Sequence, residues 1–134
     1  LSLQKAYPQV DISKTIIDFS DIKTIEDAAT ATSKQMLHGI VLIAPRPSLS
    51  TTEMPTSKQW SVAFAETFIA PLAVLQAFSN HINQQGSIVI MSGLTSKFYI
   101  PTYPNTNVIR LAWSGEIKNL MHFFSKQTIR VNAV

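Results

Sequence analysis

Two short runs of consecutive apolar residues place the strongest constraint on the fold. They are residues 39–44 (GIVLIA) and residues 88–91 (IVIM). A strand that is apolar at successive positions has both faces buried, which is typical of a parallel sheet covered by helices. The chain has 134 residues, enough for one domain with a core around such strands.

Two further segments have strand character, and three have helical character. Residues 14–19 (KTIIDF) are rich in β-branched side chains, and residues 128–134 (TIRVNAV) close the chain, so both are predicted strands. The helices are predicted from Ile22 onward after the capping residues Ser20 and Asp21, over residues 57–80 with Ser57 as cap, and over residues 103–126. The order β-α-β-α-β-α-β predicts one α/β domain, residues 1–134, with a mostly parallel sheet and right-handed crossovers.

One residue is expected to kink the helix that begins at residue 57, and another to end it. Pro71 lies inside the apolar helical pattern and should kink it, because proline lacks the N–H of an intrahelical bond. Gly86 follows Gln84 and Gln85 and is expected to end the helix through its permissive backbone.

Composition excludes several classes of site and partner. The formal charge is +3 and the eleven Lys and Arg are scattered, so no nucleic-acid partner is expected. The absence of cysteine excludes disulfides and Cys-bound zinc, and is compatible with a cytoplasmic protein. No uninterrupted apolar stretch reaches the roughly 18 residues of a membrane span, so no membrane association is expected. No metal site is predicted either, because His38, His81 and His122 lack metal-ligand spacing.

The glycines exclude a phosphate-binding loop within this chain. There are four, Gly39, Gly86, Gly93 and Gly115, and their spacing cannot build a glycine-rich turn before a helix. A dinucleotide site would therefore lack the element that holds the pyrophosphate.

A series of segments resembles the short-chain dehydrogenase/reductase family over nearly the whole chain. GSIVIMSG, a tyrosine at the start of a long helix and IRVNAV are similar to the second half of that family. KTIIDFSD resembles its third strand with the aspartate, GIVLIAP its Asn-Asn-Ala-Gly strand, and WSVAFAETFIAP the helix with its active-site asparagine. The resemblance implies a Rossmann-like three-layer sandwich, of which this chain matches about the middle half, without the first strands.

The resemblance also implies an NAD- or NADP-dependent oxidoreductase acting on a carbonyl or alcohol. Tyr103 matches the catalytic tyrosine, Asn107 the position of its lysine and Thr67 that of the asparagine. The serine position falls on Gly93 in an ungapped alignment, with Ser92 one residue earlier. The same resemblance assigns cofactor contacts to Asp18, Ala44 and Tyr103, although a helix-capping role is equally compatible with Asp18.

The substitutions predict an impaired catalytic set. In water a tyrosine has a pKa of about 10, and a cation about 4 Å away favours the tyrosinate by about 4 kcal/mol at an effective dielectric of about 20. Asn107 has no charge, so Tyr103 is expected to be a poor general base unless Arg110 or Lys97 supplies the cation. The alternative is a non-catalytic scaffold that acts as an oligomerisation or binding module.

Two architectural expectations follow from the resemblance. The missing strands leave three arrangements: residues 14–19 pair directly with residues 39–44, a second copy covers the gap, or the protein extends beyond this sequence, which is favoured. Direct pairing would place all three crossover helices on one face of the sheet. In family members the helices matching residues 57–80 and 103–126 form a dimer interface, so a homo-oligomer through these helices is expected.

Overall fold

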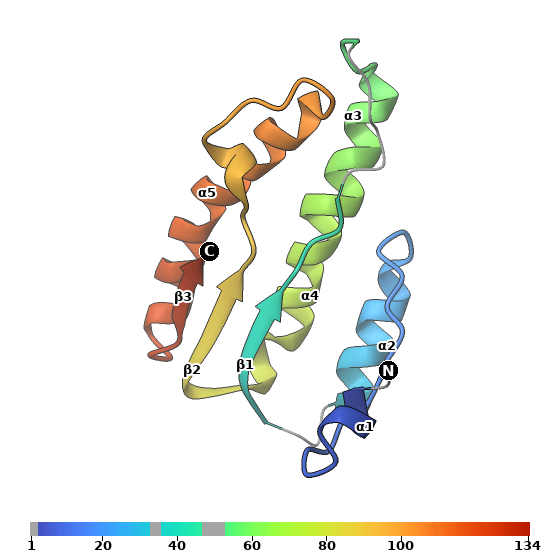
Figure 1. The fold of residues 1–134 in the computed structure, drawn as a ribbon. Coiled ribbons are helices and arrows are strands. Elements are labelled where there is room, and N and C mark those ends of the chain that lie inside the picture. Colours follow the sequence, from blue (N-terminus) through green and yellow to red (C-terminus); the bar gives the residue numbers. More distant parts are fainter. Residues whose placement is uncertain (1–2, 33–35, 47–52) are drawn as a thin grey trace.

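A computed structural model describes residues 3–32, 36–46 and 53–134 (Figure 1). Its elements, in order, are α1 (Leu3–Ala6), α2 (Ile22–Thr32), β1 (Leu37–Leu42), α3 (Ser57–Phe64), the π-helix η1 (Ala65–Ile69), α4 (Ala70–Phe78), the 3₁₀ turn η2 (Ser79–His81), β2 (Ile82–Ile90), the 3₁₀ turn η3 (Leu94–Ser96), α5 (Pro104–Ser125) and β3 (Arg130–Ala133). The α/β class and the long last helix are confirmed.

The described residues form a parallel sheet with β2 at its centre and the order β1-β2-β3. Leu42 pairs with Ile90, and Ile90 pairs with Ala133, so the carboxyl ends of all three strands meet at one edge. The apolar runs that predict β1 and β2 lie in these paired strands. Their β-branched side chains stabilise the pairing, because they pack well against one another on a pleated sheet.

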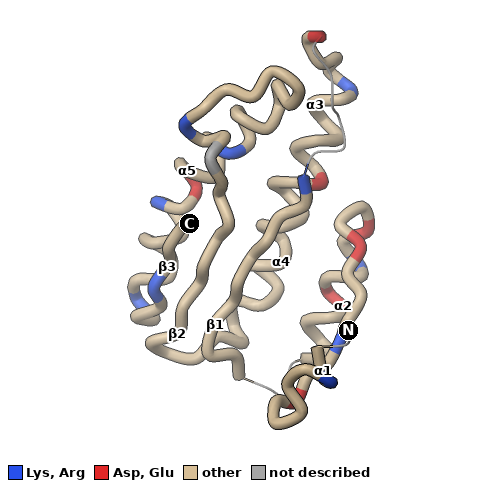
Figure 2. The backbone as a smooth tube through the Cα atoms, in the orientation of Figure 1, with Lys and Arg blue, Asp and Glu red and all other residues tan. Residues whose placement is uncertain are grey.

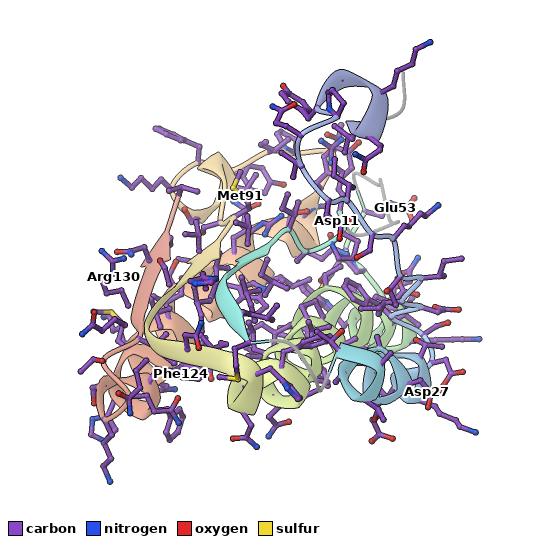
Figure 3. The ribbon with its side chains drawn as sticks, turned by 90° about the horizontal axis from the view of Figure 1, so that it is seen from below. Asp11, Asp27, Glu53, Met91, Phe124 and Arg130 are labelled. Carbon is purple, nitrogen blue, oxygen red and sulfur yellow. The ribbon has the colours of Figure 1, made fainter. Side chains whose placement is uncertain are left out.

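The core lies between this sheet and helices α4 and α5. Trp113 and Ile88 are fully buried there, with Leu75 and Ile90 almost so. The Phe68 and Trp113 rings meet edge to face, with centroids 5.0 Å apart. Seen from below, α4 and α5 form a layer beneath the strands (Figure 3).

Pro71 alters the helix one turn before its own position. Without an N–H, Pro71 cannot bond the Thr67 carbonyl four residues earlier. The backbone widens into the π-helix η1, in which the Ala70 N–H donates to the Ala65 carbonyl. The free Thr67 carbonyl instead accepts the indole N–H of Trp113 at 3.0 Å. The expected irregularity is therefore present, as a π segment joined to the core by one side-chain bond.

The cap of α3 is one residue earlier than predicted. Thr56, not Ser57, is the N-cap, and it forms a capping box with Gln59: the Gln59 N–H donates to the Thr56 hydroxyl at 3.3 Å, and the Thr56 N–H donates to Gln59 Oε1 at 2.8 Å. Glutamine three residues after the cap makes threonine the better choice, because two free donors are satisfied together.

The predicted strand over residues 14–19 is wrong. The structure assigns no strand to these residues, and Ile16 is 78% exposed. A strand needs a neighbour to bond its backbone, and the neighbour of β1 in the described sheet is β2 only. The visible order therefore contains three strands, and direct pairing of residues 14–19 with residues 39–44 does not occur.

The predicted role of Gly86 as a helix end is also wrong. The helix ends before Ile82, and Gly86 lies inside β2, where the register against β1 is irregular. A Cβ on Gly86 would lie 2.6 Å from Ile82 Cγ2 and 2.8 Å from the Asn83 carbonyl oxygen. Close approach, rather than an unusual backbone, explains this glycine; the positive φ of 65° belongs to Gln85.

The opposite face of the sheet carries exposed apolar side chains. Helix α2 packs against α4, and α4 and α5 cover one face. Val41 and Ile43 are 64% and 69% exposed, and Met91 and Val134 are also exposed. Right-handed crossovers explain the one-sided arrangement, because β1, β2 and β3 follow one another in a single direction across the sheet.

Charged residues are dispersed over the described part of the chain, and the helical segment from Ser57 to His81 is long and apolar. Figure 2 shows Lys and Arg on helices, loops and strand ends without a continuous stripe. By length and composition the helical segment Ser57–His81 could cross a membrane, with a hydropathy of 1.5 in its best window. The criterion of an uninterrupted apolar run misses this segment. A core helix of a soluble protein gives the same signal, but only 33% of that window is buried in the described structure, and Ala63, Ala70 and Leu75 are among the buried residues of the segment.

Candidate functional site

The carboxyl ends of β1 and β2 meet the start of α5 at one edge of the sheet. Ala44 follows β1, Ser92 and Gly93 follow β2, and Tyr103 is the N-cap of α5. The Ser92 N–H donates to the Val134 carbonyl at 2.7 Å, which joins this edge to the end of the chain after β3. Ligands of parallel α/β sheets bind at this edge, because the loops after the strands form crevices there.

Tyr103 is positioned by backbone geometry rather than by a side-chain cap. Its φ of −136° and ψ of 65° place it just outside the helix, and Pro104 opens the helix with its fixed φ. The side chain is half-buried. The guanidinium carbon of Arg46 lies 5.5 Å from the centroid of the Tyr103 ring, a cation–π contact.

Ser92, rather than Gly93, supplies the hydroxyl at the end of β2. Gly93 has a φ of +83°, a conformation that other residues adopt only with strain. Its carbonyl accepts the N–H and the hydroxyl of Ser96, which closes the turn. Ser92 is buried directly before this turn.

Asn107 is used to hold the loop before the helix. Its Nδ2 donates to the Phe98 carbonyl at 2.9 Å, while its buried Oδ1 has no partner among the described residues. A neutral amide thus stands one helical turn beyond Tyr103, where the family resemblance places a lysine.

Arg110 brings a positive charge to the end of β2. Its Nη1 donates to the Met91 carbonyl at 2.8 Å, next to Ser92. Burial lowers the pKa of Arg110 from its usual value, because desolvation disfavours the charged form. Lys97 is exposed in the loop before α5.

Two of the predicted residues use their side chains elsewhere. The buried Thr67 hydroxyl donates to the Ala63 carbonyl of its own helix. The Thr67 carbonyl contacts Trp113, which lies about 15 Å along α5 from Tyr103 at 1.5 Å per residue. The exposed Asp18 carboxylate accepts the hydroxyl and the N–H of Ser20, and these hydrogen bonds lower the pKa of Asp18. Ala44, Ser92, Tyr103 and Asn107 thus belong to the segments after β1 and β2 and to the start of α5, whereas Thr67 and Asp18 use their side chains elsewhere.

Three features of the site were missed from the sequence. Arg46 follows a predicted strand end, a position that could have drawn attention to it. Asn105 is fully buried at the start of α5, and neither end of its amide has a partner among the described residues. The buried Thr106 hydroxyl is likewise unpaired there. Only packing reveals the last two, because polar residues in a first helical turn are usually exposed.

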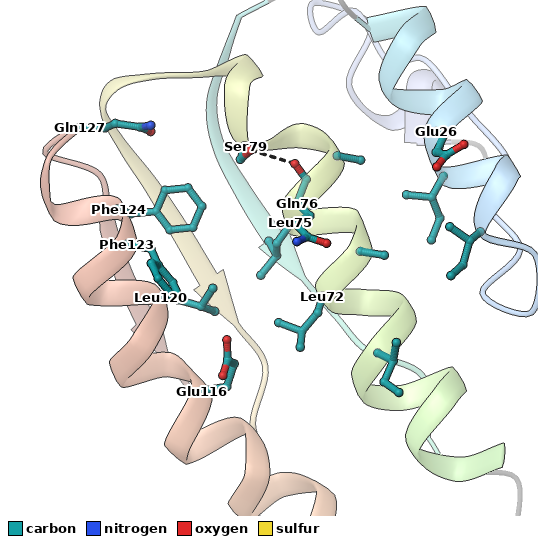
Figure 4. A pocket seen from close by; sticks show the side chains of 15 residues that line it. Glu26, Leu72, Leu75, Gln76, Ser79, Glu116, Leu120, Phe123, Phe124 and Gln127 are labelled. Carbon is teal, nitrogen blue, oxygen red and sulfur yellow. Dashed lines mark hydrogen bonds between the residues drawn. The ribbon is translucent and has the colours of Figure 1, made fainter. Parts of the chain in front are cut away.

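A large groove lies apart from this edge. It measures about 920 Å³ and lies over the outer sides of α2, α4 and α5 (Figure 4). Its lining is mainly apolar and includes Leu72, Leu120 and Phe123. None of the predicted site residues lines it, so its place favours contact with another surface over chemistry at Tyr103.

Comparisons with known proteins cover the whole described fold. A family model described as enoyl-(acyl carrier protein) reductase matches residues 3–134. No protein in the curated set matches the chain.

Several solved structures share the fold. A short chain oxidoreductase from Pseudomonas aeruginosa PAO1, described as containing an atypical catalytic center, has a TM-score of 0.87 at 19% identity, with 98% of this chain and 52% of that chain covered. L-sorbose reductase from Gluconobacter frateurii, complexed with NADPH and L-sorbose, has a TM-score of 0.83 at 16% identity, with 98% and 51% covered. A dehydrogenase/reductase from Sinorhizobium meliloti 1021 has a TM-score of 0.78 at 23% identity, with 87% and 47% covered.

These likenesses establish the fold, and the chain spans about half the length of each structure. The family model matches nearly all of the sequence, including the strand ends and the helix that begins after Tyr103. The chain therefore belongs to the short-chain dehydrogenase/reductase family.

Proposed function

We propose that this chain carries the reacting half of an oxidoreductase site that uses NAD or NADP on a carbonyl or alcohol group. The observation that carries the proposal is the placement of Tyr103 and Ser92 at the same sheet edge, where α5 begins and β2 ends. Family membership supports the reaction class. NADPH is bound in the related structures from P. aeruginosa and G. frateurii.

The residues at this edge fit the reacting end of a nicotinamide cofactor, which supplies or accepts a hydride when bound. The Tyr103 hydroxyl is the proton donor for a carbonyl oxygen, and the Ser92 hydroxyl is a second donor that polarises it. No glycine-rich turn is present in the sequence to hold the pyrophosphate. Cofactor affinity of this chain is therefore expected to be weak.

Turnover is expected to be slow because the charge near Tyr103 differs from the family pattern. Asn107 is neutral and bonded to Phe98. Arg110 is charged, but one of its donors is occupied by the Met91 carbonyl. The Arg110 guanidinium is thus held at the end of β2, and the position four residues after Tyr103 supplies no charge.

Titration of the purified chain with NADH and NADPH tests this function. A ligand that binds only the folded state raises its stability by RT ln(1 + [L]/Kd). We expect a rise in melting temperature and slow oxidation of the reduced cofactor with a carbonyl compound. Unchanged melting at millimolar cofactor, together with no turnover, would reject the proposal.

A second candidate function is a non-catalytic scaffold that associates through its helices. The observation that favours it is the apolar groove over α2, α4 and α5, whose lining includes the exposed side chains of Ile22, Ile69 and Phe123 (Figure 4). Leu111 and Met121 of α5 are also exposed. Exposed apolar patches of this kind mark association surfaces. We propose a homo-oligomer through residues 57–80 and 103–126, whether or not the chain is active.

A further inference from the structure

Arg46 presents a cation at the site from the end of β1. It follows Ala44 and Pro45, and its guanidinium lies over the Tyr103 ring with 5.5 Å between the guanidinium carbon and the ring centroid. A cation–π contact uses the charge of the guanidinium and none of its five N–H donors as a conventional hydrogen bond, so these donors can also bond an anion.

Arg110 presents a second cation from α5. It is half-buried, and one of its five N–H donors is used by the Met91 carbonyl at 2.8 Å. Within the described ranges, no carboxylate forms an ion pair with Arg46 or Arg110. A partly desolvated cation without a counter-ion is costly, so an anionic partner would stabilise this arrangement.

The surroundings of the two guanidinium groups favour an anion further. No Asp or Glu occurs between Glu66 and Glu116, a stretch that includes all of β2 and the start of α5. In Figure 2 blue segments lie at the end of β1 and around the loop after β2. The first turn of α5 adds its partial positive charge and two buried donors without partners, Asn105 Nδ2 and Thr106 Oγ1.

We propose that the Tyr103 site takes a substrate whose reacting carbonyl lies near a carboxylate, that is, a short oxo acid or the corresponding hydroxy acid, with Arg46 as its anchor. The inference rests on the proposed function. Arg46 contacts Tyr103 itself, so the anion it binds belongs to the molecule whose oxygen meets the Tyr103 hydroxyl. In the reduction, the carbonyl carbon accepts a hydride and its oxygen accepts the Tyr103 proton. The reduced nicotinamide is oxidised, and the carboxylate is unchanged.

The test compares acids with their neutral esters: pyruvate with methyl pyruvate, and acetoacetate with methyl acetoacetate. Binding to the full chain is followed by calorimetry without cofactor, and turnover by oxidation of NADPH. We expect at least one acid to bind more tightly than its ester. In Arg46→Gln its affinity should fall about tenfold or more, since a hydrogen bond to a charged group is worth about 1.5–3 kcal/mol. Ester binding should not change.

The matched control is Lys118→Gln, an equal change in charge at an exposed position of α5. It should leave acid binding unchanged, and circular dichroism verifies that both variants are folded. Equal binding of acids and esters, undetectable acid binding, or normal acid binding by Arg46→Gln overturns the inference. Loss of NADPH affinity in Arg46→Gln with normal acid affinity also overturns it, and assigns the anion to the cofactor. Tight acid binding without turnover of any carbonyl supports the inference and rejects the proposed function instead.

Discussion

Asn107 shows how one side chain can keep a site's geometry and change its chemistry. Its Nδ2 fixes the Phe98 carbonyl, so the loop that leads into Tyr103 is held by an amide. This amide nitrogen is neutral, so Asn107 supplies no positive charge near Tyr103. Tyr103 is thus placed at the strand edge by Pro104 and the helix start, and lacks the neighbouring ammonium that the family resemblance assigns to Asn107.

Replacing Asn107 by lysine is expected to raise carbonyl reduction by about 10- to 100-fold, up to the lower limit of the range of about 10²–10⁴ that is typical of a well-placed acid–base group. The reason is the added charge one helical turn beyond Tyr103. Oxidation of NADPH with a carbonyl substrate measures the change. Asn107→Met is the control, because it also removes the Phe98 bond but adds no charge. A wild type that is already fast, and that lysine does not improve, would refute our account of Tyr103.

Element packing explains the two irregular segments of the chain, η1 and the first half of β2. In η1 the missing N–H of Pro71 frees the Thr67 carbonyl for Trp113, so a local backbone defect becomes a contact between two helices. In β2 the register shift brings the chain so close to itself that only glycine fits at position 86. The first irregularity follows from the missing N–H of Pro71, and the second from the lack of space around Gly86.

Trp113→Phe is expected to destabilise the fold by about 1–3 kcal/mol, because the buried Thr67 carbonyl loses its donor. Pro71→Ala supplies a backbone N–H four residues after Thr67 and should recover part of that loss in the double variant. Urea unfolding of both single variants and the double variant gives the coupling energy. Strictly additive effects would show that the Trp113 indole N–H and a backbone N–H at position 71 do not compete for the Thr67 carbonyl.

Gly86→Ala and Gly115→Ala form a matched pair within β2 and α5. The first is expected to cost about 1–3 kcal/mol, since a Cβ would collide with Ile82 and the Asn83 carbonyl. The second should stabilise the chain by about 0.5–1 kcal/mol, because beyond the local helix backbone the new methyl group meets no atom within 4 Å, and alanine favours helix. Thermal or urea unfolding decides, and similar effects of the two changes would contradict the described packing.

At the scale of the whole molecule, two exposed apolar surfaces are candidates for the interface between copies of the chain. One is the outer side of α4 and α5, where Phe123 is 67% exposed. The other is the bare face of the sheet, where Val41 and Ile43 are exposed. The helical surface contains the large groove and includes the 22-residue helix α5, so we expect it to dominate association.

Phe123→Glu is expected to shift the chain toward a monomer, because a charge at the centre of an apolar contact cannot be desolvated without cost. Val41→Glu, the matched change on the sheet face, should leave the mass unaltered. Light scattering coupled to gel filtration, at micromolar concentration, measures both. The helical interface is refuted by a monomeric wild type, or by a mass that changes only in Val41→Glu.

Local pattern predicted most elements and the family. Continuous apolar runs identify β1 and the second half of β2, because both faces of these strands carry apolar side chains. Only one face is covered in the described structure, since Leu42, Ile88 and Ile90 are buried whereas Val41 is exposed. Helix α5 was predicted to within a residue at each end, since its apolar stripe and Pro104 are local signals. The same order of segments led to the short-chain dehydrogenase/reductase family and to Tyr103 at the helix start.

Tertiary structure decided what depends on neighbours far along the chain. Residues 14–19 have strand propensity but no strand beside them, and propensity alone cannot supply hydrogen-bond partners. Arg46 meets Tyr103 across 57 positions of sequence. Such contacts are set by how the sheet and helices pack, which no window of the sequence contains.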